Sequence, residues 1–122
     1  MADKKSIMAI DDDPMVLKVL TALLTPAYDL HFSKSAQEAI DLMNTFHPDL
    51  ILLDINMPGM SGFEFLHTIK KQPNYQNVPV IIVSGHCETE FIIYAERSGA
   101  NAVVSKPING DELLKKIEKV LS

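Results

Sequence analysis

Acidic side chains follow two separate apolar runs, and these carboxylates are the groups in the chain most able to do chemistry. Asp54 comes directly after the run 50–53, and three consecutive aspartates, Asp11, Asp12 and Asp13, follow the run 7–10. An ionised carboxylate at the end of a buried strand needs a compensating cation or a reaction to perform. Clustered carboxylates repel one another unless a hard cation such as Mg²⁺ joins them. The two acidic ends therefore predict a divalent-cation site with a carboxylate that can act on phosphate.

Two further polar groups follow later apolar runs. Ser84 ends the run 80–84, and Lys106 comes shortly after the run 102–104. A lysine and a hydroxyl can hold the remaining oxygens of a phosphoryl group that a carboxylate attacks in line. The predicted product of such an attack is an aspartyl phosphate on Asp54.

The elements that must position these groups alternate along the chain. Short apolar runs predict strands, and 3.6-residue periodicity predicts helices. The predicted strands are 6–10, 28–32, 50–53, 80–84 and 102–104, and the predicted helices are 14–24, 35–46, 62–71, 88–98 and 110–121. Asp13 before Pro14 is a predicted helix N-cap rather than a metal ligand, and Ser35 with Glu38 has the spacing of a capping box.

Five strand–helix units predict a parallel sheet with helices on both faces. Asp29 and His31 mark the second strand as an edge strand, whereas the third and fourth are almost entirely Val, Ile and Leu. We expect a doubly wound (βα)5 α/β sandwich over residues 1–122, with a five-stranded parallel sheet of flavodoxin-like order 2-1-3-4-5. The first and third strands then end side by side at the site edge, so Asp11, Asp12 and Asp54 are expected to converge there.

Composition narrows the classes of function. The chain has 122 residues and a net charge of −5, so it fits a single domain and shows no basic surface for nucleic acid or anionic membranes. No apolar stretch is long enough to span a bilayer, and the N-terminus lacks the apolar region of a signal peptide. The lone Cys87 excludes an internal disulfide. We expect a cytoplasmic protein.

Taken together, the motifs resemble those of the response-regulator receiver domain of two-component signalling. The resemblance runs from end to end, and its four motifs stand in order, each at a predicted strand end. They are Ile10-Asp11-Asp12-Asp13-Pro14, Leu53-Asp54-Ile55-Asn56-Met57-Pro58-Gly59-Met60-Ser61-Gly62, Val83-Ser84-Gly85 and Ser105-Lys106-Pro107. The resemblance implies a regulatory phosphoacceptor that changes partner binding, rather than an enzyme acting on a separate substrate.

The resemblance also implies a role for each acidic residue. Asp54 would accept a phosphoryl group from a sensor histidine kinase or a phosphotransfer protein. Mg²⁺ would be bound by Asp12, Asp54 and the backbone carbonyl of Asn56, with Asp11 acting mainly through a bound water. The output would be a downstream protein or an attached output domain.

The other two motifs have implied roles as well, and one position departs from the family pattern. Ser84 would bind the phosphoryl group, Lys106 would pair with it, and the Lys106–Pro107 bond would be cis. Receivers commonly have an aromatic residue three positions before the lysine, where this chain has Val103. We therefore expect the output to depend on the loop 84–88 and the following helix.

Two other features each have a functional interpretation and a simpler structural one. His86 lies two residues beyond Ser84, so it either orients water for hydrolysis of the acyl phosphate or is a solvated loop histidine. The predicted helix 88–98 contains five consecutive apolar residues, which one packed face cannot bury. Phe91 and Tyr94 are expected to be partly exposed, and this face is a candidate for a homodimer or for partner docking.

Several alternatives stay open. The chain could be a pseudo-receiver that signals without phosphate, or a receiver cut from a longer DNA-binding regulator or hybrid kinase. A phosphatase of the haloacid dehalogenase type would need a second aspartate where Asn56 stands. A flavodoxin would need a hydroxyl-rich phosphate loop after the first strand, where this chain has three aspartates.

Overall fold

A computed structural model describes residues 4–57 and 59–122; Met1, Ala2, Asp3 and Pro58 lie outside the described part. Strands and helices alternate through the described residues, as the sequence predicts. Their order is β1 (Ser6–Ile10), α1 (Pro14–Leu24), β2 (Asp29–Ser33), α2 (Ala36–Met43), β3 (Leu50–Asp54), α3 (Gly62–Lys70), β4 (Val80–Ser84), α4 (Thr89–Arg97), β5 (Ala102–Ser105) and α5 (Gly110–Leu121).

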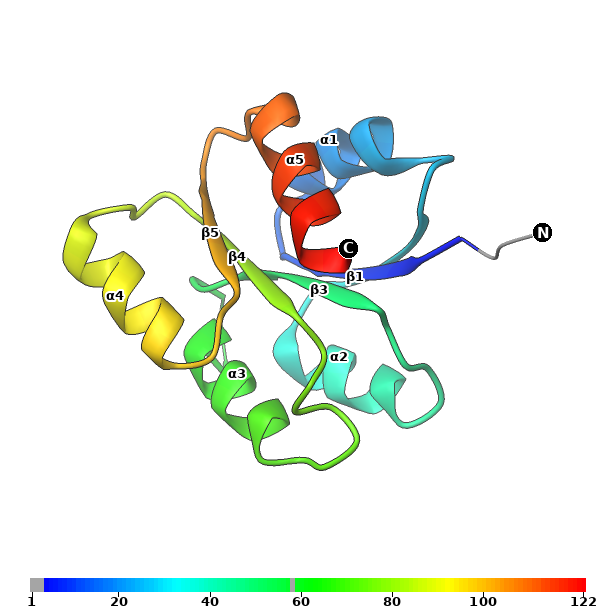
Figure 1. The fold of residues 1–122 in the computed structure, drawn as a ribbon. Coiled ribbons are helices and arrows are strands. Elements are labelled where there is room, and N and C mark those ends of the chain that lie inside the picture. The colour runs from blue at the N-terminus through cyan, green and yellow to red at the C-terminus, as the bar shows by residue number, and fades with distance from the viewer. Residues whose placement is uncertain (1–3, 58) are drawn as a thin grey trace.

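The strands form one parallel sheet between two layers of helices. Its order over the described residues is β2-β1-β3-β4-β5, which confirms the predicted 2-1-3-4-5 arrangement. Helices α1 and α5 cover one face, and α2, α3 and α4 cover the other (Figure 1). β2 is an edge strand, as its Asp29 and His31 predicted, while every residue of β3 and β4 is buried. No helix in residues 4–57 and 59–122 has the length and apolar character needed to cross a membrane.

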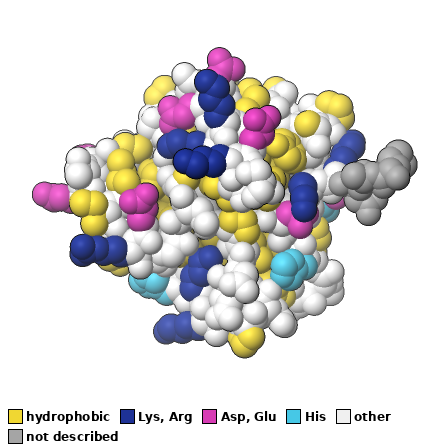
Figure 2. Space-filling model, viewed as in Figure 1, with side chains coloured by type: hydrophobic (Ala, Val, Ile, Leu, Met, Phe, Trp, Pro, Cys, Tyr) yellow, Lys and Arg dark blue, Asp and Glu magenta, His cyan; other side chains and the backbone are white. Residues whose placement is uncertain are grey.

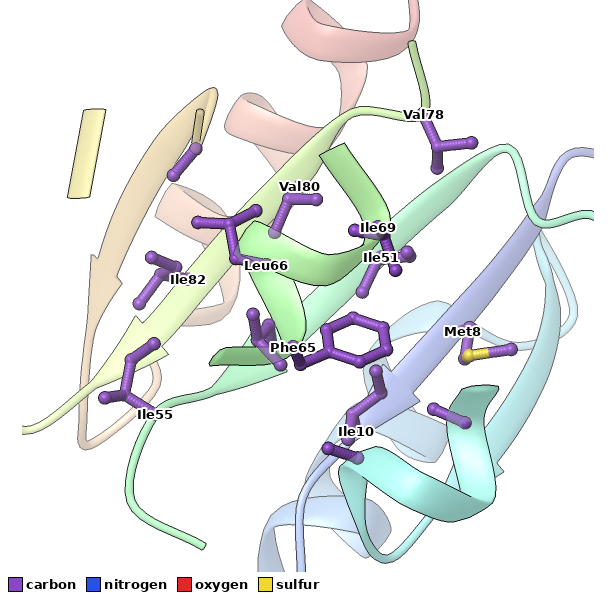
Figure 3. Close-up of a cluster of buried hydrophobic side chains, with 14 of the residues drawn as sticks. Met8, Ile10, Ile51, Ile55, Phe65, Leu66, Ile69, Val78, Val80 and Ile82 are labelled. Atoms are coloured by element: carbon purple, nitrogen blue, oxygen red, sulfur yellow. The ribbon is translucent and has the colours of Figure 1, made fainter. Parts of the chain in front are cut away.

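Alternating side chains of the inner strands fill the two layers. Met8 and Ile10 of β1 face the layer of α2, α3 and α4, where Phe65 of α3 is fully buried (Figure 3). Ile7 and Ala9 face the other layer, where Leu113 of α5 is buried. Both faces of the sheet are thus withdrawn from water, which explains why its inner strands appear in the sequence as continuous apolar runs.

Local capping fixes where the helices begin. The Asp13 side chain accepts a hydrogen bond of 2.9 Å from the backbone N–H of Met15, which confirms it as the N-cap of α1. Ser35 accepts the N–H of Glu38 at 3.1 Å and caps α2. A full capping box at the start of α3 was not predicted: Ser61 and Glu64 each accept the other's backbone N–H. These bonds satisfy donors that the first helical turn leaves free.

Six elements differ from their predicted bounds: β3, β5 and α3 by one residue at one end, β2 and α4 by one residue at each end, and α2 by up to three. Two of these differences, at α2 and β2, have a clear structural cause. α2 ends at Met43 rather than residue 46, because Asn44 and Thr45 donate to carbonyls only three residues back and tighten the last turn. β2 runs from Asp29 to Ser33 rather than over 28–32, because its pairing with β1 extends to the Ile10–Ser33 pair. Both differences come from turn and pairing geometry at the element ends.

Gly62 at the start of α3 packs directly against the end of β3. A Cβ at this position would lie 2.5 Å from the Asp54 carbonyl oxygen and 2.7 Å from the Ile55 Cα. Backbone atoms cannot yield as a flexible side chain would, so only glycine permits this approach. The Gly62 N–H also donates to the Ile55 carbonyl at 3.0 Å. The missing side chain therefore helps to set the backbone on which Asp54 stands.

We predict that Gly62→Ala lowers the free energy of unfolding by about 1–3 kcal/mol, because overpacking outweighs the better helix propensity of alanine. Chemical denaturation measures the change. Gly85→Ala is the matched control, since a Cβ at Gly85 would meet no atom within 4 Å. That variant should stay within about 0.5 kcal/mol of the wild type. Equal stability of the two variants would contradict the packing argument.

Candidate functional site

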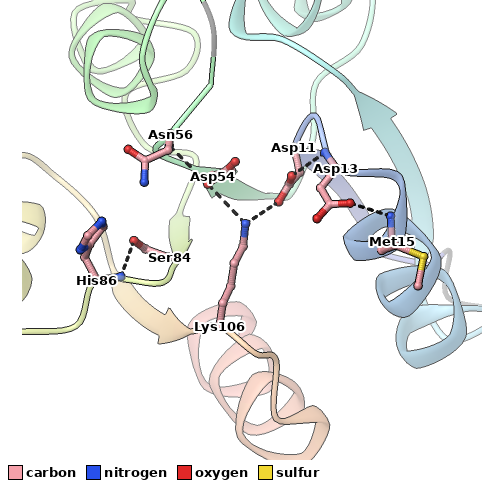
Figure 4. Close-up of polar contacts among 8 residues, drawn as sticks. All are labelled: Asp11, Asp13, Met15, Asp54, Asn56, Ser84, His86 and Lys106. Atoms are coloured by element: carbon pink, nitrogen blue, oxygen red, sulfur yellow. Dashed lines mark hydrogen bonds and ion pairs between the residues drawn. The ribbon is translucent and has the colours of Figure 1, made fainter.

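The carboxyl ends of β1 and β3 bring three carboxylates together at one edge of the sheet. These strands are neighbours, with Ile10 paired to Leu53, so the residues that follow them lie side by side. Asp11, Asp12 and Asp54 each offer an oxygen, and these oxygens lie within 4.8 Å of one another. The residues thus converge although the chain separates them widely, and Figure 4 shows Asp11 and Asp54 facing the same space.

Asp11 is the most constrained of the three. Its side chain is buried, with 3% relative exposure for the residue, and both oxygens have partners. Oδ1 accepts the backbone N–H of Asp13 at 2.9 Å, and Oδ2 accepts from Lys106 Nζ at 3.1 Å. Asp12 is exposed at the edge of the cluster. Asp13 is occupied as a helix cap, so the acidic cluster consists of Asp11, Asp12 and Asp54.

Asp54 is buried, with 6% relative exposure, at the last position of β3. Its Oδ1 accepts the backbone N–H of Asn56 at 3.3 Å and lies 3.5 Å from Lys106 Nζ. Burial raises the pKa of the Asp54 carboxyl, and the charge of Asp11 raises it further. Lys106 and the Asn56 N–H act in the opposite direction without cancelling these effects. Keeping Asp54 ionised in the folded protein therefore costs free energy.

Lys106 reaches from the end of β5 to both buried carboxylates (Figure 4). Burial alone would lower the pKa of its ammonium, but Asp11 and then Asp54 outweigh that effect and raise the pKa. The Lys106 N–H donates to the Ser84 carbonyl at 2.8 Å, and the Lys106–Pro107 bond is cis, as the resemblance implied. The closer contact with Asp11 was not anticipated, because sequence alone does not tell which carboxylate the lysine meets.

The charges at this edge do not balance by themselves. Three carboxylates face one ammonium, and the pKa of Asp54 is raised first by burial and then by the charge of Asp11. Carboxylate oxygens are the ligands that Mg²⁺ prefers, and a divalent cation would neutralise the excess. The donor set therefore fits Mg²⁺, with Asp11, Asp12 and Asp54 as the side chains able to hold it. Asn56 contacts Asp54 through its backbone N–H.

Ser84 stands at the end of β4, the strand next to β3, where Val83 pairs with Asp54. Its side chain is buried, with 1% relative exposure, and its Oγ accepts the backbone N–H of His86 at 3.0 Å. The His86 ring is exposed, and its Nδ1 lies 3.9 Å from a Glu88 oxygen. Ser84 thus connects the strand end beside Asp54 with the loop that leads into α4.

Sequence reasoning missed an apolar surface next to the acidic cluster. Met15 is 64% exposed and Val19 is 41% exposed, both on one side of α1. They line a hollow of about 230 Å³ together with Val16, Lys106, Pro107 and Ile108. The periodicity of α1 could not reveal it, because Met15 and Val19 look like core residues until the position of the β5–α5 connection is known.

Comparison with known proteins agrees with this geometry. Residues 7–118 match the family model of the response regulator receiver domain. The protein PilH of Pseudomonas aeruginosa is 31% identical over 95% of this chain and 97% of its own length. A "Probable transcriptional regulator ycf29" of Cyanophora paradoxa is 34% identical over 96% of this chain, which spans only 56% of that protein's length. The structure of the chemotaxis protein CheY4 of Vibrio cholerae superposes with a TM-score of 0.91 at 28% identity, covering 98% of this chain and all 100% of that one.

The family-model match covers far more than half of the chain, and PilH matches it over 97% of its own length at 31% identity. The family consists of regulatory switches in two-component signalling that bind Mg²⁺ at an acidic cluster, and here Asp11, Asp12 and Asp54 form one. The chain therefore belongs to the response regulator receiver domain family.

Proposed function

We propose that this chain is a phosphoacceptor switch in which Asp54 takes a phosphoryl group from a phosphohistidine of a kinase or phosphotransfer protein. The observation that carries the proposal is the buried Asp54 carboxylate, held beside Asp11 and within 3.5 Å of Lys106 Nζ. A carboxylate in such surroundings is desolvated and costly to keep ionised, which favours a reaction that uses its charge.

The chemistry follows from the groups around Asp54. An Asp54 oxygen attacks phosphorus and forms an O–P bond as the N–P bond of the donor breaks and the imidazole leaves with the electron pair. Lys106 already touches Asp54 and is held in place by Asp11, so its ammonium can pair with a phosphoryl oxygen. Ser84 has a hydroxyl at the neighbouring strand end, where it can donate to a second oxygen.

Mg²⁺ is the cofactor proposed for this step. Asp12 and Asp54 would bind it with the backbone carbonyl of Asn56, and Asp11 would act mainly through a bound water. Bound there, the ion supplies the positive charge that three carboxylates and an incoming phosphoryl group require. The exposure of Asp12 and the tight engagement of Asp11 by Asp13 and Lys106 support this division.

The apolar surface formed by Met15, Val19, Pro107 and Ile108 is the surface that we propose for the phosphodonor protein. It borders Lys106, so a partner seated on it would present its phosphohistidine to Asp54. Among the exposed large hydrophobic residues of the described chain, Met15 has the highest relative exposure. Exposed apolar groups of this kind beside a reactive centre are typical of protein contacts.

The output side is proposed to lie on α4. Phe91 is half-buried, and Ile93 and Tyr94 are 44% and 50% exposed, in agreement with the expectation that one packed face cannot bury the whole run. Self-association or docking of a downstream protein through this face remains our proposal. The chain is similar both to a protein of its own length and to a longer one, so its output could act through a separate protein or an attached domain.

Phosphorylation by a small donor tests the acceptor directly. Incubation with Mg²⁺ and acetyl phosphate should add one phosphoryl group to the wild type, and intact-mass measurement detects it. Asp54→Asn should gain nothing, because the amide cannot act as the nucleophile. Asp41→Asn, which changes an exposed aspartate on α2, is the matched control and should behave as the wild type. A gain in Asp54→Asn would assign the acceptor elsewhere, and no gain in any protein would favour the pseudo-receiver.

Stability against pH tests how far burial and the charge of Asp11 destabilise the ionised Asp54 carboxylate. A carboxyl whose pKa is raised in the folded state stabilises the fold when protonated and loses that contribution as pH rises through the folded pKa. Without metal at neutral pH, Asp54→Asn should therefore be more stable than the wild type by on the order of 1 kcal/mol, the scale of one screened like-charge contact. The difference should shrink as pH falls through the raised pKa. Added Mg²⁺ should stabilise the wild type more than the variant; equal responses would argue against Asp54 as a ligand.

Donor docking can be separated from chemistry with a protein donor. Met15→Ala should slow transfer from the phosphorylated kinase or phosphotransfer protein roughly fivefold or more, since truncating a contact residue at an interface centre costs about 1 kcal/mol or above. Reaction with acetyl phosphate should be unchanged, because no docking is needed. Ile93→Ala removes a similarly exposed apolar side chain on α4 and serves as the control. Equal slowing with both donors would show damage to the site instead.

A further inference from the structure

We propose that Met15 is a modification site for hydrogen peroxide and that oxidation of its thioether to the sulfoxide weakens the docking of a phosphodonor protein. The surface concerned is the apolar surface formed by Met15, Val19, Pro107 and Ile108. The modification would slow transfer from a protein donor without changing the chemistry at Asp54. This inference rests on the proposed function, because it concerns the regulation of the docking surface proposed there.

Met15 differs in exposure from the other methionines that the structure describes. Met8, Met43 and Met57 are buried, with 0%, 3% and 8% relative exposure. Met60 is half-buried and packs against the core cluster that contains these three residues. Met15 is 64% exposed. Since an oxidant must reach the sulfur, Met15 has the most accessible thioether in the described part of the chain.

Met15 stands beside the acidic site but outside it. Its backbone N–H donates to the Asp13 carboxylate at 2.9 Å, in the first turn of α1 (Figure 4). Val19, four residues later and therefore on the same side of the helix, is 41% exposed. Both residues line the hollow of about 230 Å³ that borders Lys106 and Pro107. An oxidant can therefore change this surface while the buried carboxylates stay as they are.

The reaction is a two-electron oxidation of the thioether. A lone pair of the Met15 sulfur attacks one oxygen of hydrogen peroxide, and the S–O bond forms as the O–O bond breaks. The hydroxide that leaves takes the proton from the transferred oxygen and becomes water. The sulfur is oxidised and the peroxide is reduced, so the peroxide is the only co-reactant. The product has a polar S–O group where an apolar thioether stood.

A sulfoxide at this position opposes burial under a partner protein. Val19 and Ile108 give the hollow apolar walls, which offer the new oxygen no hydrogen bond. Lys106 also borders the hollow, but its ammonium is already engaged by Asp11 and Asp54. A polar group that is buried without a hydrogen-bond partner costs free energy, so a docked partner would lose affinity.

The exposed face of α4 differs in its chemistry. Figure 2 shows hydrophobic side chains among acidic and basic ones at the left, over the region of α4. Ile93 and Tyr94 are exposed there, and hydrogen peroxide alone oxidises thioethers far more readily than aliphatic or phenolic side chains. Cys87, in the loop before α4, is half-buried and has a thiol that peroxide can also oxidise. The tests therefore use Cys87→Ala as the parent protein.

Peptide mapping after mild treatment with hydrogen peroxide tests the modification itself. In the parent protein, Met15 should gain one oxygen atom first, the half-buried Met60 should follow later, and the buried Met8 and Met57 should react last. Oxidation of Met60 or of the buried methionines before Met15 would overturn the assignment of the site. This measurement needs no phosphodonor, so its outcome is independent of the proposed function.

Transfer from a protein donor tests the consequence. The probe is a purified histidine kinase, autophosphorylated with ATP, that labels the parent protein. Oxidation of Met15 should slow this transfer by about tenfold, the scale of one polar group buried without a partner. The two methionine sulfoxide reductases, one for each sulfoxide epimer, should restore the rate. Labelling of Asp54 by acetyl phosphate, followed by intact mass, should keep its rate.

Matched variants decide whether Met15 is responsible, each compared with its own untreated sample. Met15→Leu keeps an apolar side chain without a thioether, so peroxide should leave its rate of transfer from the kinase unchanged. Met60→Leu should stay as sensitive to peroxide as the parent. Met15→Gln places a polar group at the same position and should slow the transfer without any peroxide. A Met15→Leu protein that peroxide still slows would overturn the inference.

The outcomes separate this inference from the proposed function. An unchanged rate of kinase transfer to protein oxidised at Met15 would overturn the inference while Asp54 remains the acceptor. An equal loss with acetyl phosphate would also overturn it, because the damage would then lie in the site. If Asp54 accepts no phosphoryl group from either donor, the proposed function fails and the effect on docking fails with it. The order of methionine oxidation still decides whether Met15 is the modification site.

Discussion

The site depends on the cost of keeping three carboxylates together with one ammonium. Lys106 touches both buried carboxylates, yet burial and then the charge of Asp11 still raise the pKa of Asp54 at the end of β3. Such a cluster persists only where the surrounding fold leaves it no freedom to spread apart. The rest of the molecule can be understood as the frame that maintains this arrangement.

That frame is a parallel sheet buried on both faces. The register of β1 with β3 sets Asp11 beside Asp54, and side chains of both strands pack into both core clusters. Gly62 lets α3 approach the backbone at Asp54 more closely than any other residue would. Asp13 serves α1 as a cap, which leaves its two acidic neighbours for the site. Asp11 itself also holds the turn before α1, because its Oδ1 accepts the Asp13 backbone N–H.

Two different surface regions adjoin this edge of the sheet. The apolar surface around Met15 adjoins Lys106, while the loop after Ser84 leads to α4 in the other helical layer, where Tyr94 is exposed. A donor protein and an output partner could therefore act on one small site from different sides. Such separation would let phosphorylation change output binding without blocking the donor, because each partner would contact a different helix.

The sequence by itself determined the order of strands and helices, the buried character of β3 and β4, and the convergence of Asp11, Asp12 and Asp54. It could do so because hydrophobic periodicity is a local property of the chain and the strand order of a parallel sheet follows from topological rules. It could not fix the end of α2 or the β2 boundary, since these depend on turn bonds and pairing register. Only the tertiary structure decided that Lys106 lies closer to Asp11 than to Asp54, that Met15 is exposed, and that Phe63 joins Phe91 and Tyr94. These are contacts between elements far apart in the chain, and their partners are chosen by how the helices pack on the sheet.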